Sequence, residues 1–485
     1  MTVRQTFSRI ITARAQRNPH EVVVRSDHEG VDVTAAELDA HSNRLAREYL
    51  ARGVGRDDLV AVGLPTGAEF VAACVAIWKL GATPHPLSPA LSRTDRAALE
   101  ESGRPALALG ARPVEPSIPW LPSGFVPTAA GTILPDAWAH SWKAPTSSGS
   151  TGRPKIVTST APALLDPDRP VAPFLPRRAV QLVTAPLWHS AAFTYAFRGL
   201  LTGHRLVLTG GFEEHRFAEL VSRHRITWTL LSPSMIRRLV RLTGRPSLDS
   251  LESVLHMGAP CAPADKRALI DLLGPSRVVE VYAGSESNGL TMITGAEWLA
   301  KPGSVGKPIG GTQIAIRRAD GSAAAPHEVG QVWMHRGNLP AYRYLGAATR
   351  RTGDGWDTLG DLGMLDEDGY LTIVERADDV IVSDGVTVYP SRVEHALAAH
   401  PAVRDAVVYP ARTGPGHTRV AAVVEVADDG VDAAAVLAYA GRRLTPAELP
   451  SLIDITRHPL RNEAGKVRRS TFRPAAYTAR VPESA

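Results

Sequence analysis

The sequence predicts an α/β protein with a large N-terminal domain and a small, mobile α+β domain at its C-terminal end. The chain has 485 residues, which is too long for one compact domain. Strand-like and helix-like stretches alternate through its first half, a pattern typical of parallel sheets. After about residue 310, short β-like segments with Asp-Gly turns at 320–321, 354–355 and 368–369 predict a small β-barrel-like part.

The individual elements follow from hydrophobic spacing and turn residues. Residues 1–20 predict an amphipathic helix that ends before Pro19, with a transit peptide as the alternative. Residues 103–145 are rich in Pro and Gly and predict irregular structure. The other predicted helices span residues 35–52, 67–80, 191–201, 217–224, 233–242, 391–399 and 433–444, and the predicted strands span 59–64, 179–185, 205–208, 227–231, 406–409 and 420–426.

Composition excludes several classes of protein. Hydrophobic residues make up 44% and charged residues 21%, an ordinary globular balance that excludes general disorder. The longest apolar run, Phe70 to Trp78, is less than half of the roughly 20 residues that a membrane-spanning helix needs. The net charge is +5 without a clustered basic patch, which argues against nucleic-acid binding. Cys74 and Cys261 lie far apart in the sequence, so we expect no disulfide and a cytoplasmic location.

Residues 146–155, Thr-Ser-Ser-Gly-Ser-Thr-Gly-Arg-Pro-Lys, have the composition of a loop that could hold phosphate. Glycines let backbone amides turn toward an anion, hydroxyl groups add donors, and Lys155 adds positive charge. Pro154 precedes the lysine, so the segment is not a Walker loop. The composition alone leaves a phosphate-binding loop and a polar surface linker both open.

This loop resembles the signature phosphate loop of the adenylate-forming superfamily, which includes acyl-CoA synthetases, peptide-synthetase adenylation domains and luciferases. Two positions depart from the motifs of that family: Leu359, directly before Gly360, stands where the family has Thr, and Glu375, directly before Arg376, stands where it has Gly. The stretch 258–308 is similar to ligases of bile acids and other bulky or aromatic acids. Seven further segments resemble family motifs in the family's order: residues 60–89, 186–189, 258–260, 282–286, 303–308, 360–361 and 376–379, followed by the lysine loop at 462–466.

The resemblance implies that the chain binds ATP and Mg²⁺. Tyr282 would stack on adenine, Asp361 would accept hydrogen bonds from the ribose, and Arg376 would bind ribose or phosphate oxygens. Glu286 would hold Mg²⁺ together with Thr151, because hard oxygen ligands suit that ion. The complete implied nucleotide-binding set is Thr146, Ser147, Ser148, Gly149, Ser150, Gly152, Lys155, Gly258, Ala259, Pro260, Tyr282, Ser285, Asp361 and Arg376.

The implied reaction joins two anions, a carboxylate and ATP, so the protein must neutralise charge and hold the line of attack. Lys466 would reach the α-phosphate and the attacking oxyanion, and its charge would matter most in the transition state. His189 would gate the acid pocket; a structural histidine is the alternative. The implied catalytic set is Lys466, Glu286, Thr151 and His189, and the expected pocket residues are Trp188, Phe193, Phe197, Met235 and Gly284.

The resemblance also implies a hinge at Asp378, between an N-terminal domain of residues 1–377 and a C-terminal domain of residues 378–485. In the family the small domain rotates after adenylation, and a thiol, often that of CoA, attacks the acyl adenylate. Asp384 stands where related ligases often carry Gly, and a carboxylate that pointed inward would repel the phosphates of CoA. A side chain that pointed to solvent would leave CoA unaffected, so the sequence leaves the CoA step open and the adenylation step untouched. The family resemblance implies CoA as the co-substrate, with a carrier thiol as the alternative.

Three functions remain open at this point. The leading one is an AMP-forming ligase that activates a hydrophobic or aromatic carboxylic acid and passes it to CoA or a carrier thiol. The second is an ATP-dependent diazotase that adenylates nitrite and diazotises an aromatic amine in bacterial secondary metabolism. The third is a non-catalytic nucleotide-binding relative, against which the presence of both Lys466 and Glu286 argues. We expect a homodimer and no nucleic-acid or membrane partner.

Overall fold

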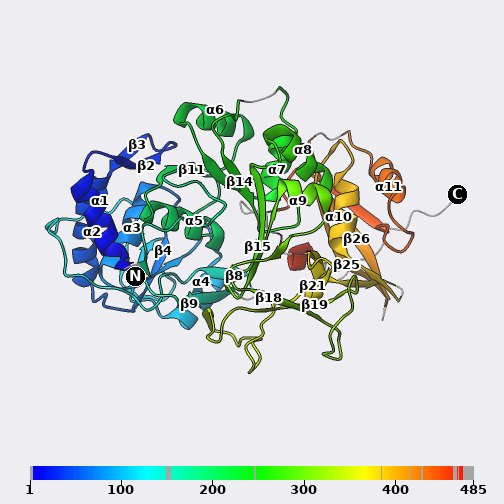
Figure 1. Cartoon of the computed structure of the whole chain (residues 1–485). Coiled ribbons are helices and arrows are strands. Elements are labelled where there is room, and N and C mark those ends of the chain that lie inside the picture. Colours follow the sequence, from blue (N-terminus) through cyan, green and yellow to red (C-terminus); the bar gives the residue numbers. More distant parts are fainter. Residues whose placement is uncertain are drawn as a thin grey trace.

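The computed structural model describes residues 4–148, 154–244, 247–383, 385–414, 417–427, 430–461, 467 and 469–472. The molecule is elongated, with the first helices at one end and the C-terminal elements at the other (Figure 1). None of the helices in these described segments is long and apolar enough to span a bilayer. Parallel sheets flanked by helices confirm the predicted α/β class.

The largest sheet has nine strands in the order β17-β16-β15-β14-β13-β11-β12-β2-β3. Its six central strands, from β15 to β2, run parallel, and the outer strands run antiparallel. The strands predicted at 179–185, 205–208 and 227–231 are confirmed as β11, β12 and β13. The nine strands are β2 (Val22–Ser26), β3 (Val31–Thr34), β11 (Val180–Val183), β12 (Arg205–Leu208), β13 (Trp228–Leu231), β14 (Ser253–His256), β15 (Val278–Ala283), β16 (Leu290–Thr294) and β17 (Lys307–Pro308).

Helices cover both faces of this sheet, because successive side chains of a strand point to opposite sides. On β11, Leu182 packs in the core that contains α6, α7 and α8, whereas Val183 packs in the core that contains α1, α2, α3 and α5. The helices predicted in this part of the chain are confirmed, with ends that differ by a few residues. Their bounds are α1 (Phe7–Arg17), α2 (Ala35–Leu50), α3 (Ala68–Lys79), α5 (Ser190–Leu201), α6 (Glu214–His224), α7 (Pro233–Val240), α8 (Pro263–Leu273) and the short α9 (Gly295–Ala300).

A second parallel sheet, β5-β4-β6-β7, lies in the N-terminal part of the molecule. Every residue of α3 from Phe70 to Lys79 is buried, as expected for a helix that is apolar on all sides. The segment 103–145, predicted to be irregular, contains β6 and β7 but little other regular structure. The elements of this layer are β4 (Leu59–Gly63), β5 (Thr83–Pro86), α4 (Arg93–Gly103), β6 (Leu107–Gly110) and β7 (Trp120–Leu121).

The β-rich part consists mainly of two antiparallel sheets, β18-β19-β21-β22 and β20-β9-β8. Two predicted Asp-Gly turns join strands of the first sheet, and Gly321 and Gly369 have φ values of 85° and 80°, which favour glycine. The strands are β8 (Thr146–Ser148), β9 (Pro154–Ser159), β18 (Gln313–Arg317), β19 (Gly330–His335), β20 (Tyr342–Leu345), β21 (Asp361–Leu365) and β22 (Leu371–Arg376), with a small pair of β1 (Gln5–Thr6) and β10 (Leu164–Leu165) elsewhere.

The C-terminal elements share a hydrophobic core of their own, whose members all lie after Asp379 in the sequence. The elements predicted there are confirmed as α10, α11 and parts of β25 and β26. This separate core supports a C-terminal domain, while its boundary after residue 377 stays a prediction. The elements are η1 (Ala377–Asp379), β23 (Ile381–Ser383), β24 (Val386–Val388), α10 (Pro390–Ala398), β25 (Val403–Gly414), β26 (His417–Val426), α11 (Ala433–Gly441), β27 (Leu452–Thr456) and η2 (Arg469–Phe472).

Candidate active site

A cavity of about 2750 Å³ opens at the carboxyl ends of the parallel strands β11, β13, β14 and β15. The β-rich sheets form another part of its wall, and α10 and β25 close it from the C-terminal side. Ligands of α/β proteins bind at this edge of a parallel sheet. A site for one small ligand measures roughly 300–1,000 Å³. The cavity therefore has room for a nucleotide and a second substrate.

One corner of the cavity joins three residues that are far apart in the sequence. Tyr282 is the penultimate residue of β15, Asp361 begins β21, and Arg376 ends β22 directly opposite Asp361. The Tyr282 hydroxyl donates a hydrogen bond to Asp361 Oδ2 at 2.5 Å, and Arg376 Nε lies 3.3 Å from Asp361 Oδ1. Burial is the main cause that raises the pKa of Asp361 and that of Tyr282. The arrangement offers an aromatic ring, a carboxylate and a guanidinium group to one ligand.

The turn that follows β14 adds backbone to the same wall. Gly258, Ala259 and Pro260 all line the cavity, together with Ser285 from the turn after β15. Gly258 has a φ of 99°, a left-handed conformation that favours glycine. The structure thus brings this predicted turn to the cavity.

Glu286 lies on the turn after β15 and is only 8% exposed. The Tyr344 hydroxyl donates a hydrogen bond to Glu286 Oε1 at 2.7 Å, and Lys155 Nζ lies 4.7 Å from the centre of the Tyr344 ring. A Cβ at Gly284 would lie 2.5 Å from a Leu359 methyl and 2.7 Å from Glu286 Oε2, so a larger residue would displace one of these side chains. The close packing holds the carboxylate at the cavity wall.

The predicted phosphate loop lies between two paired strands. β8 and β9 form an antiparallel pair in which Ser147 faces Lys155 across the ladder, and both residues line the cavity. Ser148 pairs through its backbone with Pro154. Thr146 does not line the cavity; its hydroxyl is buried without a partner among the described residues. The predicted residues Gly149, Ser150, Thr151 and Gly152 lie outside the described residues.

The C-terminal part reaches the cavity on either side of the predicted catalytic lysine. Lys466 and Asp384 lie outside the described residues. Arg461 and Val467 are described, and both line the cavity. Asp378, in η1, also lines the cavity, and its Oδ2 atom lies 3.6 Å from a guanidinium nitrogen of Arg350. The hinge role of Asp378 stays a prediction.

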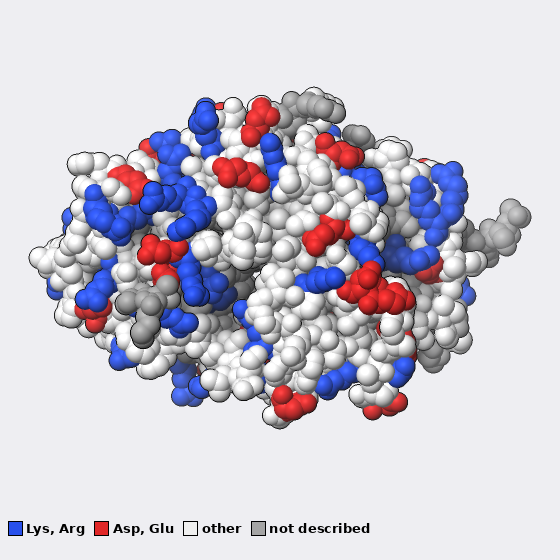
Figure 2. Space-filling view, in the orientation of Figure 1, with Lys and Arg blue, Asp and Glu red and all other residues white. Residues whose placement is uncertain are grey.

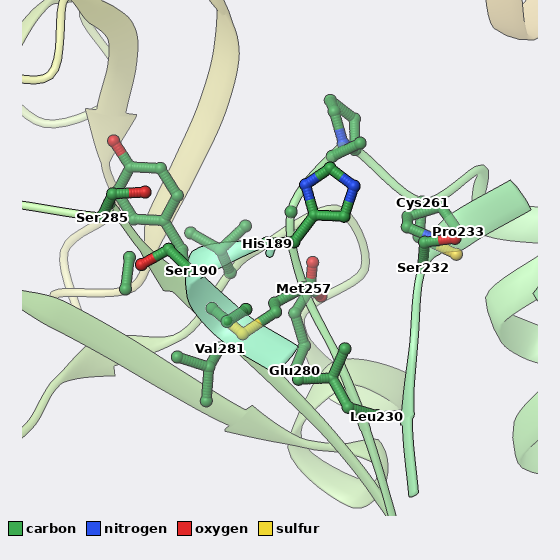
Figure 3. A pocket seen from close by; sticks show the side chains of 18 of the residues that line it. His189, Ser190, Leu230, Ser232, Pro233, Met257, Cys261, Glu280, Val281 and Ser285 are labelled. Carbon is green, nitrogen blue, oxygen red and sulfur yellow. The ribbon is translucent and has the colours of Figure 1, made fainter. Parts of the chain in front are cut away.

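His189, Met235 and Gly284 line the cavity as predicted, but three other predicted pocket residues do not. Phe193 and Phe197 are fully buried in an aromatic core with Phe70 and Trp78, so their assignment to the pocket is corrected. Trp188 is half-buried and lies outside the cavity wall. Figure 3 shows His189 and Ser190 in the pocket with the apolar side chains of Leu230, Met257 and Val281.

Most of the cationic side chains that line the cavity, Arg336 and Arg461 among them, were not predicted from the sequence, and two of them lie beside Trp142. Lys143 precedes β8 and is 4% exposed, and Arg198 lies in α5; both line the cavity. Neither belongs to a motif, so their position emerges only from the fold. The rest of the visible surface has basic and acidic side chains interspersed (Figure 2).

The donor set suits Mg²⁺ that arrives with a nucleotide. The described residues contain no cluster of three or more His, Cys, Asp or Glu that could hold a metal ion by itself. Mg²⁺ in nucleotide sites takes one or two carboxylates and completes its octahedron with phosphate and water oxygens. Glu286 supplies one carboxylate at the cavity, and its Oε2 atom has no hydrogen-bond partner in the described part of the chain.

The fold and the cavity define a nucleotide-binding α/β protein, and comparison with known proteins is more specific. The chain belongs to the AMP-binding enzyme family, whose model matches residues 11–138 and 144–344. It is 27% identical to the 2-succinylbenzoate–CoA ligase of Bacillus subtilis (strain 168) over 95% of this chain and 96% of that one. It is also 27% identical to the long-chain-fatty-acid–CoA ligase FadD13 of Mycobacterium tuberculosis, over 93% and 95% of the two chains.

Solved structures share the fold of the whole chain. The o-succinylbenzoate CoA synthetase MenE from Bacillus subtilis, in complex with an acyl-adenylate intermediate, superposes with a TM-score of 0.82. The alignment covers 98% of this chain and 99% of that chain, at 24% identity. This likeness confirms the adenylate-forming fold that the sequence motifs resemble.

Proposed function

We propose that the protein is an ATP-dependent, AMP-forming ligase that activates a hydrophobic or aromatic carboxylic acid as an acyl adenylate. The observation that carries the proposal is the convergence of Tyr282, Asp361 and Arg376 at the cavity that also contains Glu286 and Lys155. The family and the two acid–CoA ligases among its relatives support it.

The nucleotide is positioned by residues that the structure already holds together. The adenine ring stacks on Tyr282, and the ribose hydroxyls donate to Asp361, whose geometry Tyr282 and Arg376 fix. Ser147 and Lys155, which both line the cavity, then bind the phosphates. Positioning both anionic reactants before they react accounts for much of the rate gain.

The charge of the reaction is neutralised from two sides. Glu286 and Thr151 hold Mg²⁺, which supplies positive charge to the phosphate oxygens as pyrophosphate leaves. Lys466 binds the attacking oxyanion and the α-phosphate, where negative charge accumulates in the transition state. In this proposal, Arg461 and Val467 bring the segment that contains Lys466 to the cavity.

The acid binds in the apolar lobe beside α5. Leu230, Met257 and Val281 line this lobe together with His189 (Figure 3). The apolar walls exclude water from the acyl adenylate, which water would otherwise hydrolyse. The adenylate then passes to the thiol of CoA or of a carrier protein.

The comparisons do not support the diazotase alternative. We propose a cytoplasmic location, because ATP and CoA are available there. The expected homodimer stays a prediction, which light scattering on the purified protein would test.

The function is tested by release of AMP from ATP and Mg²⁺ with a panel of aromatic and aliphatic acids. Each acid is assayed with CoA, and amino-substituted aromatic acids are assayed separately with nitrite. We expect AMP to rise with an acid and an acyl-CoA to accumulate. AMP that rises only with nitrite and an aromatic amine would contradict the proposal and restore the diazotase.

A further inference from the structure

Lys143 is a buried ammonium group whose partners carry no charge. Its Nζ donates to Thr194 Oγ1 at 2.6 Å and to Ser190 Oγ at 3.2 Å, both on α5. Thr194 donates its own proton to the Ser190 carbonyl at 2.6 Å, so its oxygen is free to accept from the lysine. Within the described segments no carboxylate pairs with Lys143, and its third proton has no protein acceptor.

The other buried lysines of the described chain show that this is unusual. Lys79 and Lys266 are each 1% exposed, and each has a carboxylate partner. Lys79 Nζ lies 2.7 Å from Asp39 Oδ1, and Lys266 is hydrogen-bonded to Glu280. A buried charge is costly unless it is paired. Burial, and next the neighbouring Arg198, lower the pKa of Lys143 to about 7, although Glu286 opposes the shift.

Arg198 brings a second cation to the same place. Lys143 Nζ and Arg198 Cζ lie 5.1 and 5.6 Å from the centre of one aromatic ring, that of Trp142. Arg198 is one helical turn beyond Thr194, so Ser190, Thr194 and Arg198 follow each other along one face of α5, and all three line the cavity. No hydrogen bond or ion pair of the Arg198 guanidinium is found among the described residues.

The surface that Arg198 exposes is cavity wall rather than outer surface. Its side chain is exposed, yet desolvation lowers its pKa, as does a third cation, Arg336, which also lines the cavity. Glu286 is the carboxylate whose negative charge raises the pKa of Lys143. It accepts a hydrogen bond from Tyr344 and is proposed to hold Mg²⁺, so it does not neutralise the two cations.

The position of these cations relates them to the acid rather than to the nucleotide. Ser190, which accepts from Lys143, directly follows His189 and lines the same pocket as Leu230, Met257 and Val281 (Figure 3). The residues proposed for adenosine lie on β15, β21 and β22 instead. Resting on the proposed function, we propose that Lys143 and Arg198 form a subsite for a second carboxylate, so that the preferred substrate is a dicarboxylic acid.

Such an acid binds in two parts. One carboxylate is adenylated, the apolar body lies along Leu230, Met257 and Val281, and the second carboxylate pairs with Lys143 and Arg198. A planar guanidinium group and a carboxylate form two parallel hydrogen bonds, and the lysine adds a third donor. The ammonium and guanidinium groups then gain an anionic partner that none of the described residues provides.

The test compares matched acids in matched variants. 3-Phenylpropionate is compared with its three ring-carboxylated forms, 3-(2-, 3- and 4-carboxyphenyl)propionate, by kcat/KM for pyrophosphate release. The variants are Lys143→Met and Arg198→Met, and Lys301→Met is the control, because Lys301 pairs with Asp366 outside the cavity. We expect the wild type to prefer one diacid at least tenfold over the monoacid. Each cavity variant should lower that preference about tenfold, the lower end of what a hydrogen bond to a charged group contributes.

Direct binding separates this inference from the proposed function. Calorimetric titration with the diacids is made in parallel, since binding does not require turnover. Diacid binding that Lys143→Met abolishes, without AMP formation by any acid, would refute the ligase and retain the subsite. AMP formation in which neither variant changes the diacid preference or affinity would overturn the subsite. The inference would also be overturned if both variants, assayed with the monoacid, showed the same rise of KM for ATP or CoA. The two cations would then bind phosphate groups.

Discussion

At the scale of single residues, the cavity is organised by which charged groups have partners. Asp361 is buried and contacts both Tyr282 and Arg376, so its position is fixed before a ligand arrives. Lys143 and Arg198 contact no carboxylate among the described residues. The first group could be predicted, because each member belongs to a motif. The second could not, because a lone lysine and a lone arginine carry no spacing signal.

Removal of one hydroxyl tests the proposed nucleotide corner. In Tyr282→Phe the ring that faces adenine remains, but Asp361 loses the hydrogen bond at 2.5 Å. We expect KM for ATP to rise about tenfold with little change in kcat, because a hydrogen bond to a charged group contributes about 1.5–3 kcal/mol. Tyr370→Phe, a change outside the cavity, is the control and should leave KM unchanged. An unchanged KM for ATP in Tyr282→Phe would remove Tyr282 from the nucleotide site.

Diacid binding should depend on pH through Lys143, whose pKa is about 7 in the free protein. Below that pH the ammonium group is charged and attracts the second carboxylate, and above it the neutral amine does not. The apparent affinity for the diacid should therefore fall as the pH rises from 6 to 9, as calorimetry would measure. Arg198, Glu286 and His189 also line the cavity, so the same pH series is measured with Lys143→Met to separate the effect of the lysine from theirs. An equally steep fall in that variant would assign the titration to another group.

At the scale of elements, α5 explains both a correct and a wrong prediction. The sequence predicts its helical span well, since apolar residues recur at helical spacing. Phe193 and Phe197 lie on the face that packs into the aromatic core, whereas Ser190, Thr194 and Arg198 lie on the face that lines the cavity. Periodicity reveals that a helix has two faces. It does not reveal that the polar face meets a cavity, because that depends on elements elsewhere in the chain.

The turn after β15 depends on a residue without a side chain. In Gly284→Ala the new Cβ would collide with Leu359 and with Glu286 Oε2, both closer than 3 Å. We expect Glu286 to shift and kcat to fall at least tenfold, with a higher Mg²⁺ requirement in a steady-state titration. Gly353→Ala is the control, because nothing lies within 4 Å of the added atom there. Wild-type kcat and Mg²⁺ dependence in Gly284→Ala would show that the position of Glu286 does not matter.

At the scale of the whole molecule, the C-terminal elements close one side of the cavity and are held there by arginines of α7 and its C-terminal end. Arg237 donates to the Arg404 carbonyl at 3.2 Å, and Arg241 donates to the carbonyls of Val403 and Ala398 at 2.9 and 3.2 Å. The sequence predicts the C-terminal elements from their own spacing. It cannot predict these contacts, because they join a side chain to backbone carbonyls more than a hundred residues away.

Loss of one of these arginines should loosen the C-terminal part. In Arg241→Met two hydrogen bonds to carbonyls disappear, and we expect the undocked population to rise about fivefold, the effect of about 1 kcal/mol. Limited proteolysis between residues 377 and 391 would report it as faster cleavage. Arg343→Met, an exposed position on β20, is the control. Cleavage at the wild-type rate would mean that other contacts hold the C-terminal part.

The central claim is that the protein forms an acyl adenylate at this cavity, and acid-dependent ATP–pyrophosphate exchange measures that step without CoA. We predict exchange in the wild type that requires both an acid and Mg²⁺. In Lys466→Ala it should fall about 100-fold or more, because the lysine stabilises charge that develops in the transition state. Lys301→Ala, the matched control, should exchange like the wild type. No exchange with any acid, or exchange in Lys466→Ala within about threefold of the wild type, would contradict this account.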